Sequence, residues 1–404
     1  MIRRMFAFGV VGRLAAAFAV VLGLVAVVGG ALAPTAGASE STYVIGNIGT
    51  YTGPVSGDYG SDRQVLTAWE KAVNASGGIN GHKVKVIALD DQGNPTVSLQ
   101  DAQELVQQDH VLAVVDDNSN GGTNYGSYLE QQGVPLIGAT SNPPASTDTL
   151  FFPVGASTLG EINGEAAAAQ LVGAKKIAFI YCAEAAVCAE VVPLIKADAA
   201  ANGAEVSYVS AAAESAPSYT SYCLAAKQSG ATAVLTALAS PAVISIAQDC
   251  AQQGYNPHFL LGGAPVGPTF EATSGLNGSL AVEGVFPWIQ DNTPATEAFH
   301  NAVKKYESSI TKSSTWNATT AYTWTGAELF EAAAAKMKGD SPSDLATALY
   351  SLKGVTLGGL LAPETFSPTK QANPTCYTLM KQENGKYSVL DDGHFTCPSS
   401  SASS

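Results

Sequence analysis

The chain has 404 residues, of which 46% are hydrophobic and only 13% charged, and its formal net charge at pH 7 is −14. Nucleic acid and anionic lipid surfaces repel a protein this acidic, which argues against both as partners. The length exceeds what one hydrophobic core of ordinary size covers, so we expect two domains.

Residues 1–38 have the pattern of a secretory signal peptide. Three arginines precede an apolar run from Leu14 to Ala33, and the small residues Ala36, Gly37 and Ala38 follow. This order predicts cleavage after residue 38, although the run is long enough to remain as a membrane anchor. Cleavage would leave a net charge of 20 − 3 − 34 = −17. Because no cysteine lies at the cleavage site, we expect a secreted protein, periplasmic or associated with the cell surface, without a lipoprotein anchor.

The first half of the secreted chain predicts strands that alternate with helices. Strands are expected at 42–49, 83–90, 111–115 and 134–138. Helices are expected after the capping residues Ser61 and Asn94, and near 122–132. Nearly continuous apolar strands separated by helices are typical of a parallel sheet covered on both faces.

The same alternation restarts at Ser157, which can cap a helix to Val172. Further strands are expected at 175–181, 204–210, 232–238 and 258–263, with helices from about Val187, around Cys223 and from Pro241. After Val282 come three helices, near 296–309, 319–338 and 342–352, and then a β-rich end. We expect these late segments to complete the two domains, and the Ser-rich tail 399–404 to be disordered.

Six cysteines lie in the secreted part of the chain. They are Cys182, Cys188, Cys223, Cys250, Cys376 and Cys397. An even number in an oxidising compartment predicts disulfides, whereas zinc would need paired Cys and His spacings that the sequence lacks. Pairing in sequence order is the simplest of the 15 connectivities, since each pair then closes a local loop. No metal or other cofactor is expected.

Polar loops follow the predicted strands, and ligands of doubly wound sheets bind at the carboxyl ends of strands. These loops lie at 50–54, 90–91, 116–122, 139–144, 182–188, 239–241 and 263–265. Hydroxyls, amides and glycines dominate them, which suits hydrogen bonding to a small polar solute. Turns and helix caps use the same residue types, so any single loop also has this simpler explanation.

Three segments resemble a known family. They run from 45 to 95, from 133 to 147 and from 348 to 368. The TGP…YG start, the NASGGINGHK turn and the DDQGNP turn follow one another in the family's order. The chain resembles the periplasmic solute-binding proteins of the branched-chain amino-acid (Leu/Ile/Val-binding protein-like) type, which feed ABC importers. The resemblance covers nearly the whole secreted chain.

The resemblance implies an α/β fold of two doubly wound Rossmann-like lobes, joined by three crossovers, with a solute cleft between them. This is the type I periplasmic binding protein fold. By the family pattern, 41–157 plus 288–357 form lobe 1, and 158–287 plus 358–398 form lobe 2. The lobes would close on a small solute, and a permease and ATPase complex would be a transient partner of a monomeric protein.

The resemblance places one group of ligand-binding residues in lobe 1. They are Tyr59, Asn118, Ser119, Asn120, Ala139, Thr140 and Ser141. The loop ATSNP matches the family's pattern, so the amides and hydroxyls of 139–141 are implied to hold a carboxylate without any lysine. Ser119 or Asn120 is implied to contact the solute, and Tyr59 to cover it.

Lobe 2 departs from the family's pattern. Amino-acid binders place tyrosines after its first and third strands and a glutamate after its fourth, which meets the solute's ammonium group. Here these places read AEAAV, ALASP and GGAPVG, with Ser240 and Ala264 as the expected contacts. A buried ammonium group without a carboxylate partner is very costly. Either Glu184 supplies that carboxylate, or the solute is an amide, a small carboxylate or an aromatic acid.

Two further features concern the cleft. A disulfide between Cys182 and Cys188 is expected at the rim of lobe 2, where it would lower the ordering cost of closure. Redox chemistry is not indicated, because the C-x-x-C spacing is absent. Trp288 or Trp316 could stack on an aromatic solute, or pack at a hinge or helix.

Catalysis and ligand sensing are the two alternatives to solute transport. No Walker loop, G-x-S-x-G, H-E-x-x-H or G-x-G-x-x-G motif occurs, so we expect no enzyme. The carboxylate pairs at 90–91 and 116–117 could bind a metal or act as acid and base, but the first pair belongs to the family's turn. A ligand-sensing receptor module with the same fold is the alternative to a transport protein.

Overall fold

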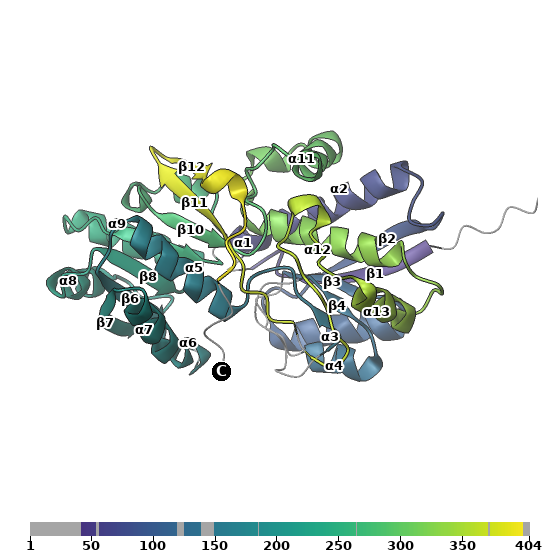
Figure 1. Cartoon of the computed structure of the whole chain (residues 1–404), viewed down its shortest axis with the longest axis horizontal. Coiled ribbons are helices and arrows are strands. Elements are labelled where there is room, and N and C mark those ends of the chain that lie inside the picture. Colours follow the sequence, from purple (N-terminus) through teal and green to yellow (C-terminus); the bar gives the residue numbers. More distant parts are fainter. Residues whose placement is uncertain are drawn as a thin grey trace, which may run out of the picture. The chain divides into compact units, whose positions relative to one another are not determined.

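The computed structural model describes residues 42–53, 56–118, 125–138, 149–184, 186–263, 265–370 and 372–398. These residues lie in one compact unit that contains two β-sheets (Figure 1). The expected signal peptide and the tail 399–404 lie outside the described residues. No helix within the described ranges has both the length and the apolar character needed to cross a membrane.

The first sheet is entirely parallel and has the strand order β2-β1-β3-β4-β5. Its strands are β1 (Thr42–Gly49), β2 (Lys83–Asp90), β3 (Val114–Asn118), β4 (Leu136–Ile137) and β5 (Phe151–Phe152). Side chains of β1 alternate between the two faces: Tyr43 and Ile45 join one hydrophobic cluster and Ile48 joins another. Both faces of this sheet are therefore buried, as nearly continuous apolar strands require.

Helices cover both faces of the first sheet. Their bounds are α2 (Asp62–Ala75), α3 (Pro95–Gln107), α4 (Gly126–Gln132), α11 (Pro294–Tyr306), α12 (Thr319–Ala334) and α13 (Pro342–Ser351). α2 and α12 share the cluster of Tyr43 and Ile45, whereas α3 and α4 share that of Ile48. Asn94 caps α3 as predicted, by accepting hydrogen bonds from the amides of Thr96 and Val97.

Ser61 precedes α2 but does not cap it, so this part of the prediction is wrong. Its side chain makes no capping hydrogen bond and instead meets the Thr315 hydroxyl. A contact from a distant segment has replaced the local one. The helix itself begins where the sequence indicates, at Asp62.

The second sheet has the order β12-β11-β10-β9-β8-β6-β7. Its strands are β6 (Lys176–Cys182), β7 (Glu205–Ala212), β8 (Ala233–Ala237), β9 (His258–Gly262), β10 (Leu280–Glu283), β11 (Thr378–Glu383) and β12 (Lys386–Val389). The strands from β6 to β10 are parallel. β11 and β12, yellow in Figure 1, continue the sheet beyond β10 as an antiparallel pair.

Helices cover both faces of the second sheet as well. They are α5 (Thr158–Leu171), α6 (Ala186–Glu190), α7 (Val192–Ala201), α8 (Thr220–Gln228) and α9 (Ser240–Gln252). α5 and α7 pack on one face through Ile162 and Ile195, and α8 and α9 pack on the other. Ser157 caps α5, as predicted, by accepting a hydrogen bond from the Gly160 amide. Two short helices, α1 (Ser56–Tyr59) and α10 (Pro268–Glu271), lie at strand ends of the two sheets.

The chain passes three times between the two sheets. The crossings lie between β5 and α5, between β10 and α11, and between α13 and β11. α11, α12 and α13 return to the first sheet, where α11 and α12 pack on α2. The predicted fold of two doubly wound lobes joined by three crossovers is thereby confirmed.

The three crossovers contact one another. The Ser157 amide of the first donates to the Pro374 carbonyl of the third at 2.7 Å. The Phe286 amide of the second donates to the Leu360 carbonyl of the third at 2.9 Å. Gly284 of the second lies directly on the main chain of the first, where an added Cβ would be 1.9 Å from the Ala156 nitrogen.

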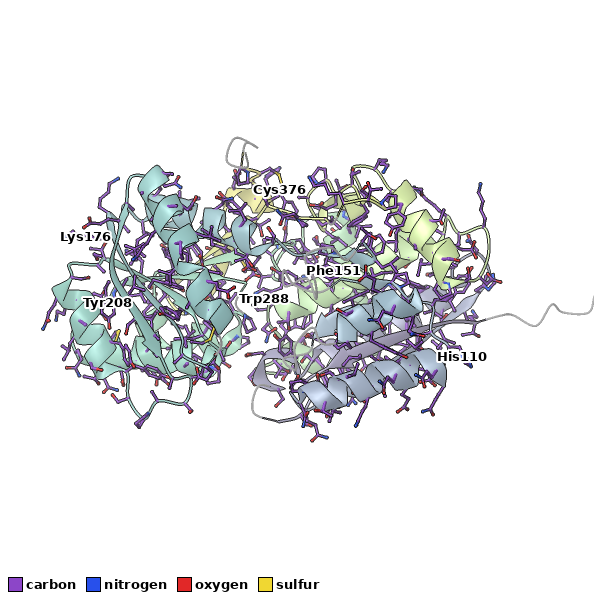
Figure 2. All side chains as sticks on the ribbon, turned by 90° about the horizontal axis from the view of Figure 1, so that it is seen from below. His110, Phe151, Lys176, Tyr208, Trp288 and Cys376 are labelled. Atoms are coloured by element: carbon purple, nitrogen blue, oxygen red, sulfur yellow. A yellow bond between two sulfur atoms is a disulfide. The ribbon has the colours of Figure 1, made fainter. Side chains whose placement is uncertain are left out.

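All six cysteines are paired in sequence order, the connectivity that the sequence favours. The bonds are Cys182–Cys188, Cys223–Cys250 and Cys376–Cys397 (Cys376 is labelled in Figure 2). The second links α8 to α9 inside the core, where both cysteines are at most 1% exposed. The third fastens the end of the described chain beside β11.

Candidate functional site

The carboxyl end of the first sheet holds a network around the Asp90-Asp91 turn. The Asp91 carboxylate accepts hydrogen bonds from the hydroxyls of Thr50 and Ser98, each at 2.7 Å. Asp90 accepts from the Thr52 hydroxyl at 2.6 Å and from the Tyr51 amide at 3.0 Å. Burial alone would raise the pKa of Asp90, but these hydrogen bonds hold it below its usual value. The pair thus shapes the loop after β1 through these hydrogen bonds.

Tyr51 and Asn47 lie beside this turn. The Tyr51 hydroxyl donates to the Asn47 side chain, whose amide donates to the Val115 carbonyl at 3.0 Å. The Arg63 guanidinium lies 5.4 Å from the centre of the Tyr51 ring. A cation over an aromatic face is attractive, so this arginine places a positive charge close to the carboxyl end of β1.

Tyr59 lies at the end of α1 and is partly buried. Two side chains at the start of α12 hold the main chain of α1. The Asp58 carbonyl accepts from the Asn317 amide at 2.8 Å and from the Thr319 hydroxyl at 3.0 Å. α1 therefore has a fixed position on the first lobe, although four residues are too few for a stable helix by themselves.

In the second lobe, Ser240 begins α9 and is 6% exposed. Its hydroxyl lies beside the Asp58 carboxyl, but among the described residues it makes no fully formed hydrogen bond. Glu184, in the loop after β6, is exposed and accepts a hydrogen bond from the Glu214 amide at 2.9 Å. This bond ties the loop after β6 to the loop after β7.

Six of the predicted ligand-binding residues lie outside the described residues. They are Ser119, Asn120, Ala139, Thr140, Ser141 and Ala264. Asn118 ends β3, and only its main chain is described. The roles of these residues stay predictions. In the described parts of the chain, no group of three or more His, Cys, Asp or Glu residues could hold a metal ion.

Trp288 and Trp316 pack against each other within the protein. Their ring centres are 6.1 Å apart in an edge-on arrangement, and Phe299 stacks on Trp316 at 5.2 Å (Trp288 is labelled in Figure 2). Both tryptophans are buried. The two tryptophans therefore pack within the protein, which is one of the two roles considered for them, the other being stacking on an aromatic solute.

Three glutamates at the carboxyl edge of the second sheet, of which Glu165 and Glu283 are buried, were not found from the sequence. Glu161 and Glu165 project from α5 onto the end of β9, where a Cβ on Gly263 or Gly262 would lie 2.5 Å from their respective carboxyl oxygens. Glu283, 1% exposed, ends β10. The sequence contains one indication of this group: two glutamates four residues apart on a helix, and a Gly-Gly pair at the end of a strand.

Glu161 and Glu165 border a cavity. Its volume is about 250 Å³, and Glu161, Glu165, Phe179, Leu235 and the Cys188 segment line it. Burial, and then the neighbouring Glu161, raises the pKa of Glu165 well above its usual range. Burial likewise raises the pKa of Glu283, although the Tyr322 hydroxyl beside it opposes the shift. Glu165 and Glu283 are therefore most stable in the neutral form.

Replacing Glu283 with glutamine should raise the stability of the folded protein at pH 8 more than at pH 5. The pKa of Glu283 is higher in the folded than in the unfolded protein. Its contribution to the free energy of unfolding is therefore present at low pH and is lost as the pH rises through the folded-state pKa. Glutamine is neutral throughout and removes this loss. Urea unfolding at both pH values checks it, with the exposed Glu190→Gln as control; an equal change at both pH values would contradict the argument.

Comparison with known proteins identifies the family. Residues 42–386 match the family model described as periplasmic binding protein. The chain belongs to this family. Its members bind small solutes outside the cytoplasm and work with ABC transporters, as the resemblance of the sequence predicts.

Solved structures of this family have the same fold. A leucine-binding protein from Thermotoga maritima aligns with a TM-score of 0.72 at 17% identity, over 88% of this chain and 99% of that one. A branched-chain amino-acid ABC transporter protein from Thermus thermophilus with bound valine gives 0.74 at 14% identity, over 89% and 97%. A fatty-acid ABC transporter substrate-binding protein from Thermomonospora curvata gives 0.72 at 17% identity, over 89% and 93%.

Among curated proteins, an amino acid binding protein of Pseudomonas aeruginosa is 34% identical over 108 residues. This match covers 26% of the chain and only 28% of that relative's length. The periplasmic binding protein fold is thus shared with proteins whose solutes differ, from valine to a fatty acid.

Proposed function

We propose that this periplasmic binding protein captures a small polar solute by lobe closure and delivers it to an ABC permease and ATPase complex. The family match over residues 42–386 is the observation that carries the proposal. The proposed lobes are 41–157 with 288–357, and 158–287 with 358–398. The role is one of binding rather than catalysis, and the location is outside the cytoplasmic membrane.

The proposed solute is an amino acid, a small carboxylate or an amide. Its carboxylate or carbonyl end would bind to 139–141, and Tyr59 would cover it. If the solute has an ammonium group, Glu184 is a candidate partner, because the Glu214 amide holds its carboxylate at the carboxyl end of β6. Without an ammonium group, that carboxylate has no role in the solute site.

A thermal-shift screen tests this proposal. The secreted protein would be unfolded, stripped of bound solute and refolded, then mixed with amino acids, their deaminated acids, amides and urea-like compounds. A micromolar binder at millimolar concentration adds about 4 kcal/mol to the stability of the native state. A shift with amino acids supports an ammonium partner in lobe 2, and a shift only with acids or amides supports the other solute class. A correctly folded protein that no compound stabilises contradicts the proposal.

The double substitution Thr140→Val with Ser141→Ala should weaken binding of the solute found in that screen more than tenfold. Each hydrogen bond to a charged group contributes about 1.5 to 3 kcal/mol. Calorimetric titration measures the change, with Ser221→Ala on the exposed side of α8 as control. Unchanged affinity would show that the solute does not bind to this loop.

A further inference from the structure

Asp58 links the two lobes. It belongs to α1, which is fixed to α12 of the first lobe, while its carboxyl lies beside Ser240 at the start of α9 in the second lobe. A small cavity of about 100 Å³ adjoins this contact and is lined by Asp58, Ser240, Pro241, Thr269 and Asn317, among others. We call the contact of Asp58 with the start of α9 the α1–α9 seam.

Neighbouring bonds hold the seam in place. The segment that fixes the Asp58 main chain also reaches the second lobe, because the Ala318 amide donates to the Val266 carbonyl at 3.0 Å. The residue before α9, Ala239, has no side chain that could cap the helix, and no side-chain cap is present. Asp58 is thus the acidic group at an uncapped helix end, supplied from the other lobe.

Two effects on the charge of Asp58 oppose each other. A helix N-terminus and the Ser240 hydroxyl favour the carboxylate. Burial in the seam disfavours it, and so does Glu214, the charged group that faces Asp58 from the loop after β7. The α9, 265–270 and 314–317 residues around the cavity add no charged side chain. On α2, Asp62 is bound to the Thr319 hydroxyl, and Arg63 lies over Tyr51.

Burial is the larger effect, and it raises the pKa of Asp58 to about 6 from an ordinary value of 3.8. When the seam is open, water restores the ordinary value. At a pH between these two pKa values, Asp58 therefore takes up a proton when the seam forms.

We propose that the α1–α9 seam is an acid-favoured latch, which closes the lobes with Asp58 protonated and loosens when Asp58 is ionised. The proposal rests on lobe closure as part of the proposed function. By linkage, the ratio of closed to open molecules should rise about tenfold between pH 7 and pH 5, and level off below about pH 4. Solute capture would then be stronger in an acidic medium.

Distance measurement between the lobes tests the latch without any solute. Because the described chain has no free cysteine, Gln103→Cys on α3 and Lys196→Cys on α7 would be the only sites to take spin labels. In the otherwise unchanged protein, the ratio of short to long distances should rise about tenfold from pH 7 to pH 5. Asp58→Asn should keep this ratio high at both pH values, and Glu190→Gln should leave the pH dependence unchanged. A ratio independent of pH overturns the latch.

A second measurement follows the titration of Asp58 itself by NMR. In protein with ¹³C-labelled aspartate carboxyls, Asp58 should titrate near pH 6, a signal that Asp58→Asn lacks. Titration of Asp58 near its ordinary value overturns the latch. Because neither measurement needs a solute, their outcomes are distinct from that of the thermal-shift screen, which decides the proposed function.

Discussion

Replacing Gly284 with alanine should destabilise the folded protein by about 3 kcal/mol or more. The new methyl group would lie 1.9 Å from the Ala156 nitrogen and 2.7 Å from the Gly155 carbonyl carbon. Both are main-chain atoms, so no side-chain rotation can relieve the overlap, and overpacking of this kind costs several kcal/mol. Gly284 cannot move away easily either, because its amide donates to the Tyr322 hydroxyl at 2.7 Å.

Urea unfolding would measure this loss, with Gly57→Ala as control. A Cβ on Gly57 meets nothing within 4 Å, so that substitution should change stability by less than about 0.5 kcal/mol. If Gly284→Ala were as stable as the unchanged protein, the close approach of the first two crossovers would be refuted.

The second large effect concerns the buried disulfide between α8 and α9. Replacing Cys223 and Cys250 by alanine should lower the free energy of unfolding by about 2 to 4 kcal/mol, because the unfolded chain regains the freedom of a long loop. The Cys182–Cys188 bond closes a shorter loop, with a sequence separation of 6 against 27. Its removal should cost about 1 kcal/mol less by the same argument.

Chemical denaturation of the two double variants would check this order. The unchanged protein after reduction provides a third reference, in which all the bonds are absent. A larger loss from removing the Cys182–Cys188 bond would contradict the loop argument and would indicate that this bond supports packing around Cys188 in the native state.

Local patterns in the sequence predicted the elements that local interactions form. Asn94 and Ser157 cap their helices because each acts on amides two or three residues away. Ser61 looked equally suitable, yet its hydroxyl meets Thr315, 254 residues further along the chain. Such a partner follows only from the way that α2 and the segment before α12 pack together.

The candidate site shows the same limit. The Asp90-Asp91 turn could be read from its motif, and its hydrogen bonds are local to one sheet edge. The contact of Asp58 with Ser240 joins two lobes, and Glu161 and Glu165 gain their environment from Gly262 and Gly263, about a hundred residues later in sequence order. Burial created by distant segments, and not residue type, gives these acids their properties.

The contacts among the three crossovers also constrain movement of the lobes. Hydrogen bonds join the third crossover to the first at Ser157 and to the second at Phe286. At Gly284 the main chain of the second crossover lies in close contact with that of the first. Segments fastened side by side cannot bend independently of one another. We therefore expect one lobe to rotate against the other about a single shared axis, and twisting or sliding of the lobes to be unfavourable.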